Sequence, residues 1–381
     1  MEAYLDNSAT TKCFDEVKDI VVKTMTEDYG NPSAMHLKGV EAEKYVKEAA
    51  AAIAKTLKVQ EKEIFFTSGG TESDNWALVG TALANCRQGK HIITTSFEHA
   101  AVSAPLDWLK EQGYDLTVIP VDEKGNLSME ELEAAIRPDT ILVSTMYVNN
   151  EVGAVVPVEA VAKLVHEKNP KTVYHVDAIQ GYGKYRIYPK RAGIDLLSVS
   201  SHKIHGPKGV GFLYVSEKVK IRPLILGGGQ QKGMRSGTDN VPGIAGLGTA
   251  ARMVYENHEE KIEKLRALKS YLAENLSAME RVVINGPAPK DGAPHIVNAS
   301  FLGVRSEVLL HTLEEKGIYV SAGSACSSHK RAASATLTAI SADKERRESA
   351  IRFSLSEFTT KEELDHTLEE IRTVLPVLRK Y

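Results

Sequence analysis

The chain has 381 residues, of which 43% are hydrophobic and 25% charged, and its formal net charge is −3. This near balance of charge excludes a global attraction to nucleic acid or to an anionic membrane surface. The first residues lack the basic start and apolar stretch of a signal peptide, and no apolar run reaches the roughly 18 residues that span a membrane. Cys13, Cys86 and Cys326 are the only cysteines, too few and too far apart for a disulfide framework, so we expect a cytoplasmic protein.

The order of predicted elements indicates two domains of an α/β protein. Strand-like runs at residues 63–67, 91–95, 116–121, 140–148, 172–177, 195–200 and 210–216 alternate with helical segments at 71–86, 103–111, 130–136 and 158–166. This alternation predicts a mostly parallel sheet with helices on both faces. A long charged helix over 252–279 then leads to strands at 296–300 and 351–354 and helices at 307–316 and from 361. We expect a large domain over residues 16–254 and a small domain over 255–381 together with 1–15.

A lysine follows two serines and a histidine in the segment Ser200-Ser201-His202-Lys203, directly after a predicted strand. This pattern suits pyridoxal phosphate, because the amine can form a Schiff base with the cofactor aldehyde and the other side chains can bind its phosphate. Asp177 ends an earlier strand-like run, where open α/β sheets present ligand-binding groups, and its carboxylate can pair with the pyridinium nitrogen. A lone lysine is usually a solvated surface group, but these neighbours favour the cofactor lysine.

Two further segments suit the same cofactor. The turn Thr67-Ser68-Gly69-Gly70-Thr71 follows a strand and opens a helix, where backbone N–H groups can bind phosphate; the alternative is tight packing. His99 follows the strand at 91–95 and can stack on a pyridine ring and transfer protons, although a hydrogen-bonded loop histidine is the more common role. The histidines lack the spacing of metal ligands, so we predict no metal.

Cys326 lies among small residues in Gly323-Ser324-Ala325-Cys326, and the basic residues that follow favour its thiolate. Lacking an apolar periodicity, it is a better candidate for a reactive thiol than Cys13 or Cys86, which we interpret as small hydrophobic residues. Arg352 stands alone in an alternating strand pattern, where its guanidinium could bind a carboxylate or face solvent as a surface arginine.

Taken together, these segments resemble the cysteine desulfurases of NifS/IscS type in the class V aminotransferase family. The resemblance extends over essentially the whole chain, with matching segments in one order at residues 4–11, 29–33, 66–75, 148–153, 175–180, 200–203, 234–238, 323–326 and 351–354. It implies the fold of PLP-dependent transferases of the aspartate aminotransferase type (fold type I), with a mostly parallel large-domain sheet and a smaller α+β domain.

The resemblance also implies a role for each matched residue. Lys203 would be the Schiff-base lysine, His99 would stack on the ring, and Asp177 and Gln180 would partner the pyridinium nitrogen and the phenolic oxygen. Asn150, also counted with the cofactor-binding residues, would take the substrate carboxylate together with Arg352, and Cys326 would carry a persulfide. The phosphate would be held by Gly70, Thr71, Ser200 and His202, and by Thr238 from the other subunit of a homodimer.

Two residues depart from the family pattern: Ser201 stands where glycine is usual, and His205 where tyrosine is usual. We expect both to be tolerated. The segment after Cys326 is of the longer type and unusually basic, and the sequence ends at Tyr381 without the extension by which housekeeping members engage an iron–sulfur scaffold. The sulfur acceptor could be such a scaffold, a tRNA-thiolation enzyme or a sulfur-carrier protein, and the absent extension favours the second.

The sequence therefore predicts an enzyme that converts L-cysteine to L-alanine and leaves sulfur on Cys326. A selenocysteine lyase or another class V aminotransferase is the first alternative, but a transaminase needs no thiol at Cys326. A non-catalytic interaction protein is the second, against which the set of Lys203, Asp177, His99 and Cys326 argues. A nucleotide-binding dehydrogenase is excluded because no Gly-x-Gly-x-x-Gly turn follows the first strand.

Overall fold

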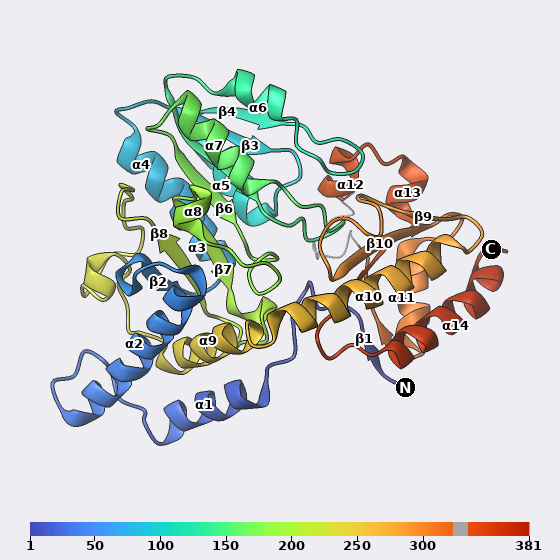
Figure 1. The fold of residues 1–381 in the computed structure, drawn as a ribbon, viewed down its shortest axis with the longest axis horizontal. Helices are drawn as coiled ribbons and strands as arrows, with labels where there is room; N and C mark the ends of the chain where they lie inside the picture. The colour runs from blue at the N-terminus through green and yellow to red at the C-terminus, as the bar shows by residue number, and fades with distance from the viewer. Residues whose placement is uncertain (323–333, 381) are drawn as a thin grey trace.

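The computed structural model describes residues 1–322 and 334–380, and a seven-stranded sheet forms the centre of its larger part (Figure 1). Its strands are β2 (Ile64–Thr67), β3 (His91–Thr95), β4 (Asp115–Ile119), β5 (Thr140–Met146), β6 (Val173–Asp177), β7 (Leu196–Ser200) and β8 (Gly211–Val215). They lie in the order β2-β8-β7-β6-β5-β3-β4. Neighbouring strands from β7 to β4 are parallel, and only β8 runs antiparallel to its neighbours β7 and β2. The predicted mostly parallel sheet is confirmed.

Alternate side chains along each strand enter different hydrophobic cores, as expected for a sheet covered on both faces. Tyr174 and Val176 of β6 belong to one core, whereas Val173 belongs to the other. The first core is completed by α1 (Asp15–Thr26), α2 (Leu37–Leu57), α6 (Met129–Ala135), α7 (Val158–Lys168), α8 (Pro189–Ala192) and α9 (Val241–Val254). The second is completed by α4 (Thr81–Asn85), by α5 (Ala100–Glu111) and by a wider helical turn at Trp76–Gly80, which joins α3 (Gly70–Asn75) to α4.

Two predictions about helices were wrong. The long helix expected over 252–279 is two helices, α9 and α10 (His258–Ser277), because Asn257 between them adopts a left-handed conformation with φ 49°. The predicted elements began only at residue 63 and missed α1 and α2. The N-cap residue of α1 is Phe14, which makes no side-chain capping bond, so the usual signal for a helix start is absent there.

A second, smaller sheet carries the carboxyl-terminal part of the chain. Its antiparallel strands lie in the order β12 (Ser321–Ala322), β13 (Ala350–Ser354), β10 (Ile296–Phe301) and β9 (Val282–Ile284). The helices of this part are α10, α11 (Ser306–Glu314), α12 (Ala335–Ala339), α13 (Lys344–Glu348) and α14 (Lys361–Leu378). Its own hydrophobic core includes Leu272, Phe301, Leu309 and Leu368. The predicted boundary after residue 254 falls between α9 and α10, and the division into two domains stays a prediction.

The amino-terminal segment connects the two parts. Strand β1 (Ala3–Tyr4) pairs in parallel with β11 (Ile318–Tyr319), so the first residues lie beside the carboxyl-terminal elements (Figure 1). The backbone N–H of Asn7 then donates to the carbonyl of Ser354, and that of Thr11 donates to the carbonyl of His202 next to the large sheet. Within the described residues, no helix combines the length and the apolar character needed to cross a membrane.

Candidate active site

The parallel strands β3, β5, β6 and β7 end at one edge of the large sheet, and most of the predicted site residues follow these ends. His99 follows β3, Asn150 follows β5, Asp177 is the last residue of β6, and Lys203 follows β7. Because parallel strands present their carboxyl ends together, residues separated by more than 100 positions in the sequence come together at this edge.

A cavity of about 380 Å³ at this edge contains the predicted phosphate ligands. It is lined by Gly70 and Thr71 from the start of α3, by Ser200 and His202 from the end of β7, and by Thr10 of the amino-terminal segment. Gly69 adopts φ 148°, a conformation that glycine tolerates and other residues rarely adopt, so the turn depends on it. A cavity of about 580 Å³ at the other end of the strands is lined by Glu63, Lys190 and Tyr214 among others and contains none of the predicted residues.

Lys203 lies at the end of a short 3-10 turn, Ser201–Lys203, that follows β7. Its amine donates hydrogen bonds to the backbone carbonyls of Ser8 and Ala9, the latter at 2.8 Å. The neighbouring His202 bonds through Nδ1 to the hydroxyl of Thr10 at 3.2 Å. Burial, and then the positive charges of Lys203 and Lys208, lower the pKa of His202 to about 4, so its imidazole is neutral at physiological pH.

Asp177 lies on β6, the neighbour of the strand that precedes Lys203, and His99 follows β3, two strands beyond β6 in the sheet. Asp177 is buried, and its Oδ1 accepts a hydrogen bond of 2.9 Å from the N–H of Ile179. Burial raises the pKa of Asp177, whereas the Ile179 N–H and the charges of His99 and Lys203 act to lower it. His99 caps the start of α5, where its Nδ1 accepts a bond of 3.1 Å from the N–H of Ala101. Its Nε2 is therefore the protonated nitrogen when the ring is neutral.

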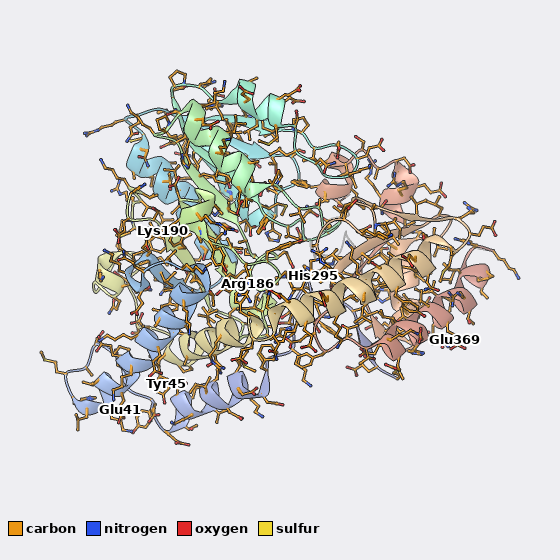
Figure 2. The ribbon with its side chains drawn as sticks, viewed as in Figure 1. Glu41, Tyr45, Arg186, Lys190, His295 and Glu369 are labelled. Carbon is orange, nitrogen blue, oxygen red and sulfur yellow. The ribbon has the colours of Figure 1, made fainter. Side chains whose placement is uncertain are left out.

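Gln180 and His295 connect this edge to the small sheet. The Gln180 amide donates to the carbonyl of Ser8 at 2.9 Å, and its oxygen lies 3.4 Å from Nε2 of His295. His295 lies between the parts of the molecule that hold the two sheets (Figure 2). Gln180, the predicted partner of the phenolic oxygen, thus contacts both the amino-terminal segment and the carboxyl-terminal part of the chain.

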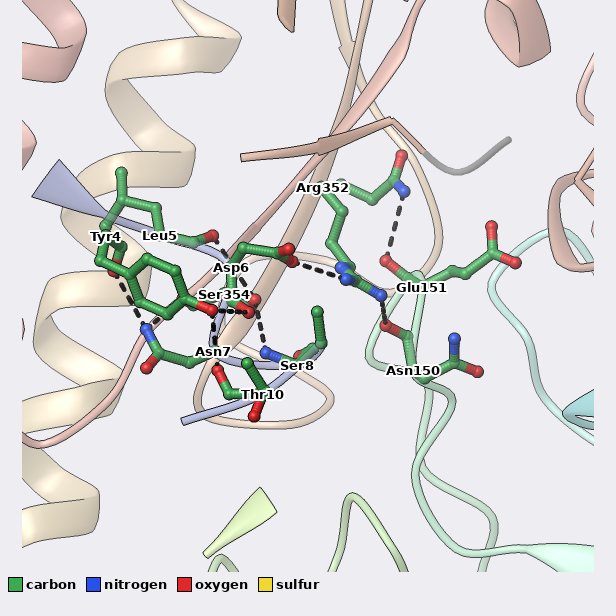
Figure 3. Close-up of polar contacts among 12 residues, drawn as sticks. Tyr4, Leu5, Asp6, Asn7, Ser8, Thr10, Asn150, Glu151, Arg352 and Ser354 are labelled. Atoms are coloured by element: carbon green, nitrogen blue, oxygen red, sulfur yellow. Dashed lines mark hydrogen bonds and ion pairs between the residues drawn. The ribbon is translucent and has the colours of Figure 1, made fainter. Parts of the chain in front are cut away.

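Arg352 reaches the site from β13 and lies among groups from distant parts of the chain (Figure 3). Its Nη1 donates to the backbone carbonyl of Asn150 at 2.9 Å, and its Nη2 forms an ion pair with Asp6 at 2.7 Å. Its Nε is buried without a hydrogen-bond partner, although other groups on the guanidinium are paired. The structure therefore brings together Arg352 and Asn150, the two residues predicted to take the substrate carboxylate, and adds Asp6 to them.

Cys326 and the other residues of its motif, Gly323, Ser324 and Ala325, lie outside the described residues. The described chain on either side of residues 323–333 is close to Arg352. Before this stretch, β12 pairs with β13 so that Ser321 stands opposite Arg352. After it, the hydroxyl of Ser334 donates to the partly buried carboxyl of Glu151, the residue after Asn150.

Thr238 is exposed in a segment that is fixed beside the glycine-rich turn of its own chain. Arg235 makes a bidentate pair with Glu72, with N–O distances of 2.9 and 3.1 Å. Glu72 also accepts a bond of 2.8 Å from the N–H of Ser68 in the turn. The predicted contribution of Thr238 to a partner subunit stays a prediction.

The two departures from the family pattern are accommodated differently. His205 has φ 64°, stacks on Phe14 with ring centroids 4.6 Å apart, and bonds through Nδ1 to the carbonyl of Lys12 at 2.8 Å. Ser201, by contrast, is fully buried and its hydroxyl has no hydrogen-bond partner. The histidine is therefore well integrated, whereas the serine leaves a polar group unsatisfied.

Several residues of the site were missed by sequence reasoning. Asp6, Ser8 and Thr10 belong to the family-like segment at residues 4–11, which could have indicated a role for the amino terminus. Asp74 and Glu98 are buried carboxyl groups that stand next to recognised motif residues. Among the residues that the structure describes, no group of three or more histidine, cysteine or acidic side chains could hold a metal ion.

Comparison with known proteins agrees with this arrangement. The model of the aminotransferase class-V family matches residues 3–367. The chain is 42% identical to a cysteine desulfurase IscS of Clostridium botulinum (strain Hall), over 100% of this chain and 96% of that protein. It superposes on a NifS-like protein with a TM-score of 0.94 and 40% identity, covering 99% of this chain and 100% of the other. It superposes on SspA in complex with cysteine with a TM-score of 0.82 and 32% identity, covering 94% and 100%.

The chain therefore belongs to the aminotransferase class-V family, among the cysteine desulfurases of NifS/IscS type.

Proposed function

We propose that this protein is a pyridoxal phosphate-dependent cysteine desulfurase that takes sulfur from L-cysteine onto Cys326 and releases L-alanine. The observation that carries the proposal is the convergence of Lys203, Asp177 and His99 beside a glycine-rich cavity, in a chain of this family. The cysteine bound to SspA, a structural relative, supports the assignment of the substrate.

The side chains present fit the cofactor. Backbone N–H groups at the start of α3, together with Ser200 and neutral His202, surround a cavity that suits a phosphate. Asp177 is a buried carboxyl with a backbone N–H on one oxygen, which suits a protonated ring nitrogen on the other. Lys203 supplies the amine to which the cofactor aldehyde would bind. When bound, pyridoxal phosphate supplies an electron sink for the bonding electrons at the substrate Cα.

The protein residues then have distinct tasks. Arg352 would bind the substrate carboxylate, as its position next to Asn150 supports. Lys203 would remove the proton from Cα and return protons to the product, and His99 would hold the ring in place. The Cys326 thiolate would attack the substrate sulfur, so that an S–S bond forms while the substrate Cβ–S bond breaks. L-cysteine and the enzyme thiol together become L-alanine and an enzyme persulfide, with no other oxidant or reductant required.

We infer that the persulfide is passed to an acceptor protein of iron–sulfur cluster assembly or of tRNA thiolation. The chain before residues 323–333 pairs opposite Arg352, and the chain after them bonds to Glu151, the residue after Asn150; both support the delivery of Cys326 to the substrate. We also propose a cytoplasmic location, because the free thiol that attacks the substrate must be kept from forming a disulfide.

A pair of variants separates the chemical steps. Cys326→Ser should still bind L-cysteine, seen as a change in the visible absorbance of the bound cofactor, but should form no persulfide. Lys203→Ala should retain phosphate-mediated binding of the cofactor but produce no alanine. Cys86→Ser, which changes an exposed cysteine, is the matched control and should keep the parent rate. If Cys326→Ser releases sulfide at the parent rate, or Lys203→Ala still forms alanine, the proposed roles are wrong.

We further propose a homodimer whose site includes Thr238 of the partner subunit. Exposed apolar side chains gather in the segment from α1 to the start of α2, where Met25, Tyr29, Met35 and Leu37 are 61–103% exposed. Such a surface is typical of a protein interface. Mixing two inactive variants, Lys203→Ala and Thr238→Arg, should restore partial activity, because one site of each mixed dimer carries neither change. Mixed subunits that exchange and stay inactive would show that one chain builds the site.

A further inference from the structure

Three carboxyl groups lie close together behind the site edge of the large sheet. Asp74 comes from α3, Glu98 from the turn after β3, and Asp177 from the end of β6. Their residues are 0%, 8% and 4% exposed. Repulsion by Asp177 raises the pKa values of both other groups, which places all three within one electrostatic cluster. A cluster of three buried carboxylates cannot be fully ionised without compensating charge.

Only Asp177 has such compensation. The N–H of Ile179 donates to its Oδ1, and the positive charge of Lys203 also acts to lower its pKa. These groups favour the ionised form of Asp177 over the ionised forms of its two neighbours.

Neither carboxyl oxygen of Asp74 has a hydrogen bond of good geometry, although the nearby hydroxyl of Ser198 acts to lower its pKa. The nearest basic group is His175, whose Nε2 lies 3.6 Å from Oδ1 of Asp74. Both nitrogens of His175 are already bonded, to Ser144 at 2.8 Å and to Ser198 at 2.9 Å. Burial lowers the pKa of His175 to about 3, so it carries no charge that could offset an ionised Asp74. Burial and the repulsion by Asp177 raise the pKa of Asp74 well above its ordinary value.

Only one oxygen of the Glu98 carboxyl accepts hydrogen bonds, an arrangement that suits a protonated acid. Its Oε1 accepts a bond of 2.9 Å from the N–H of Met146 and a second from the hydroxyl of Thr95, whereas its Oε2 is buried without a partner. Burial raises the pKa of Glu98 to about 8. The bond to Met146 links the turn that carries His99 to the end of β5, which pairs with β6 so that Met146 stands opposite Asp177.

We propose that Asp74 and Glu98 are uncharged positioning residues, and that Asp177 carries the only negative charge beneath the cofactor ring. The two neutral acids fill the space around Asp177 without competing for the ring nitrogen, and Glu98 also fixes the turn that bears His99. The place of the ring rests on the proposed function, whereas the protonation states can be measured without any cofactor.

Infrared spectroscopy of the cofactor-free protein at pH 6.5 tests this assignment, because protonated carboxyl groups have a C=O band that carboxylates lack. Asp74→Asn and Glu98→Gln should each remove one such band, and Asp177→Asn should remove none. If Asp74→Asn does not fold, carbon-13 labelling of aspartate in the parent should shift one buried band and leave the Glu98 band unshifted. A parent without a protonated aspartate band, or a parent band that Asp177→Asn alone removes, would overturn the proposal.

A second measurement concerns the pH dependence of the visible absorbance of the bound cofactor. Relative to the parent, the proton concentration at the midpoint should change by less than about twofold in Asp74→Asn and Glu98→Gln. In Asp177→Asn it should change more than tenfold. A tenfold shift in Asp74→Asn would show that the charge is shared and would refute the proposal. A protein that binds no pyridoxal phosphate would instead refute the proposed function, and the infrared result would still decide the protonation states.

Discussion

Gly211 lies where β8 passes closest to the glycine-rich turn, and its replacement by alanine tests whether that turn holds the cofactor phosphate. An added Cβ would lie 2.5 Å from the carbonyl oxygen of Val199 and 2.9 Å from Cα of Gly69. Both are backbone atoms and cannot rotate away as the end of a side chain can. Strand β7, which contains Val199, is paired on both sides, so we expect the turn at Gly69 to move. A movement of the turn by about half an ångström is needed to bring Cα of Gly69 to a tolerable distance from the added Cβ.

The size of the effect follows from which atoms move. Overpacking of this kind costs about 1–3 kcal/mol of the free energy of unfolding. Gly69 directly precedes the N–H groups of Gly70 and Thr71, which would donate to the phosphate. Weakening one charge-assisted hydrogen bond by about 1.5–3 kcal/mol corresponds to roughly ten- to a hundred-fold weaker cofactor binding.

Titration of the cofactor-free protein with pyridoxal phosphate measures the dissociation constant, and urea unfolding measures stability. Gly89→Ala is the matched control, since its Cβ would lie 2.0 Å from the carbonyl oxygen of Asp139 at the other end of the sheet. The control should lose stability but keep the parent affinity for the cofactor. Parent affinity in Gly211→Ala, or an equal loss of affinity in Gly89→Ala, would refute the assignment of the turn.

Three further changes probe stability. Burial lowers the pKa of Lys184 to about 8, below its ordinary value of 10.5, so the unfolded chain binds more protons between these values. The free energy of unfolding should therefore increase with pH by about 1.4 kcal/mol per unit between pH 8 and 10.5. Urea unfolding of Lys184→Met at several pH values should lack this increase. Asp6→Asn leaves the buried Arg352 without its anionic partner and should cost about 2–4 kcal/mol by chemical denaturation; a loss below about 0.5 kcal/mol would mean that the pair is fully solvated. Ser201→Ala removes an unpaired buried hydroxyl and should be neutral or stabilising by about 1 kcal/mol, whereas Ser198→Ala breaks a bond to a buried histidine and should destabilise. Equal losses in both serine variants would contradict this distinction.

Much of the fold was evident from local sequence patterns. Each predicted strand of the large sheet overlaps an observed one, because a buried strand needs a short β-branched or aromatic run bounded by turn residues. The helix after the glycine-rich turn and the helix from residue 361 were equally local signals, and the latter begins with a capping box in which Thr360 and Glu363 bond reciprocally. The left-handed break at Asn257 was missed because charged helix-forming residues continue on both sides of it.

The motif at Lys203, the strand-end Asp177 and the turn at Gly70 could be recognised because each combines its chemistry with a local structural signal. The sequence thus determined the strands, the principal motifs and the family. The tertiary structure decided which side chains meet: Asp6 pairs with Arg352 across 346 positions, and the carbonyls of Ser8 and Ala9 accept bonds from Lys203. It also decided that Asp74 and Glu98 are buried beside Asp177. Such contacts leave no periodic trace in the sequence, because they depend on how distant segments pack and on how much water that packing excludes.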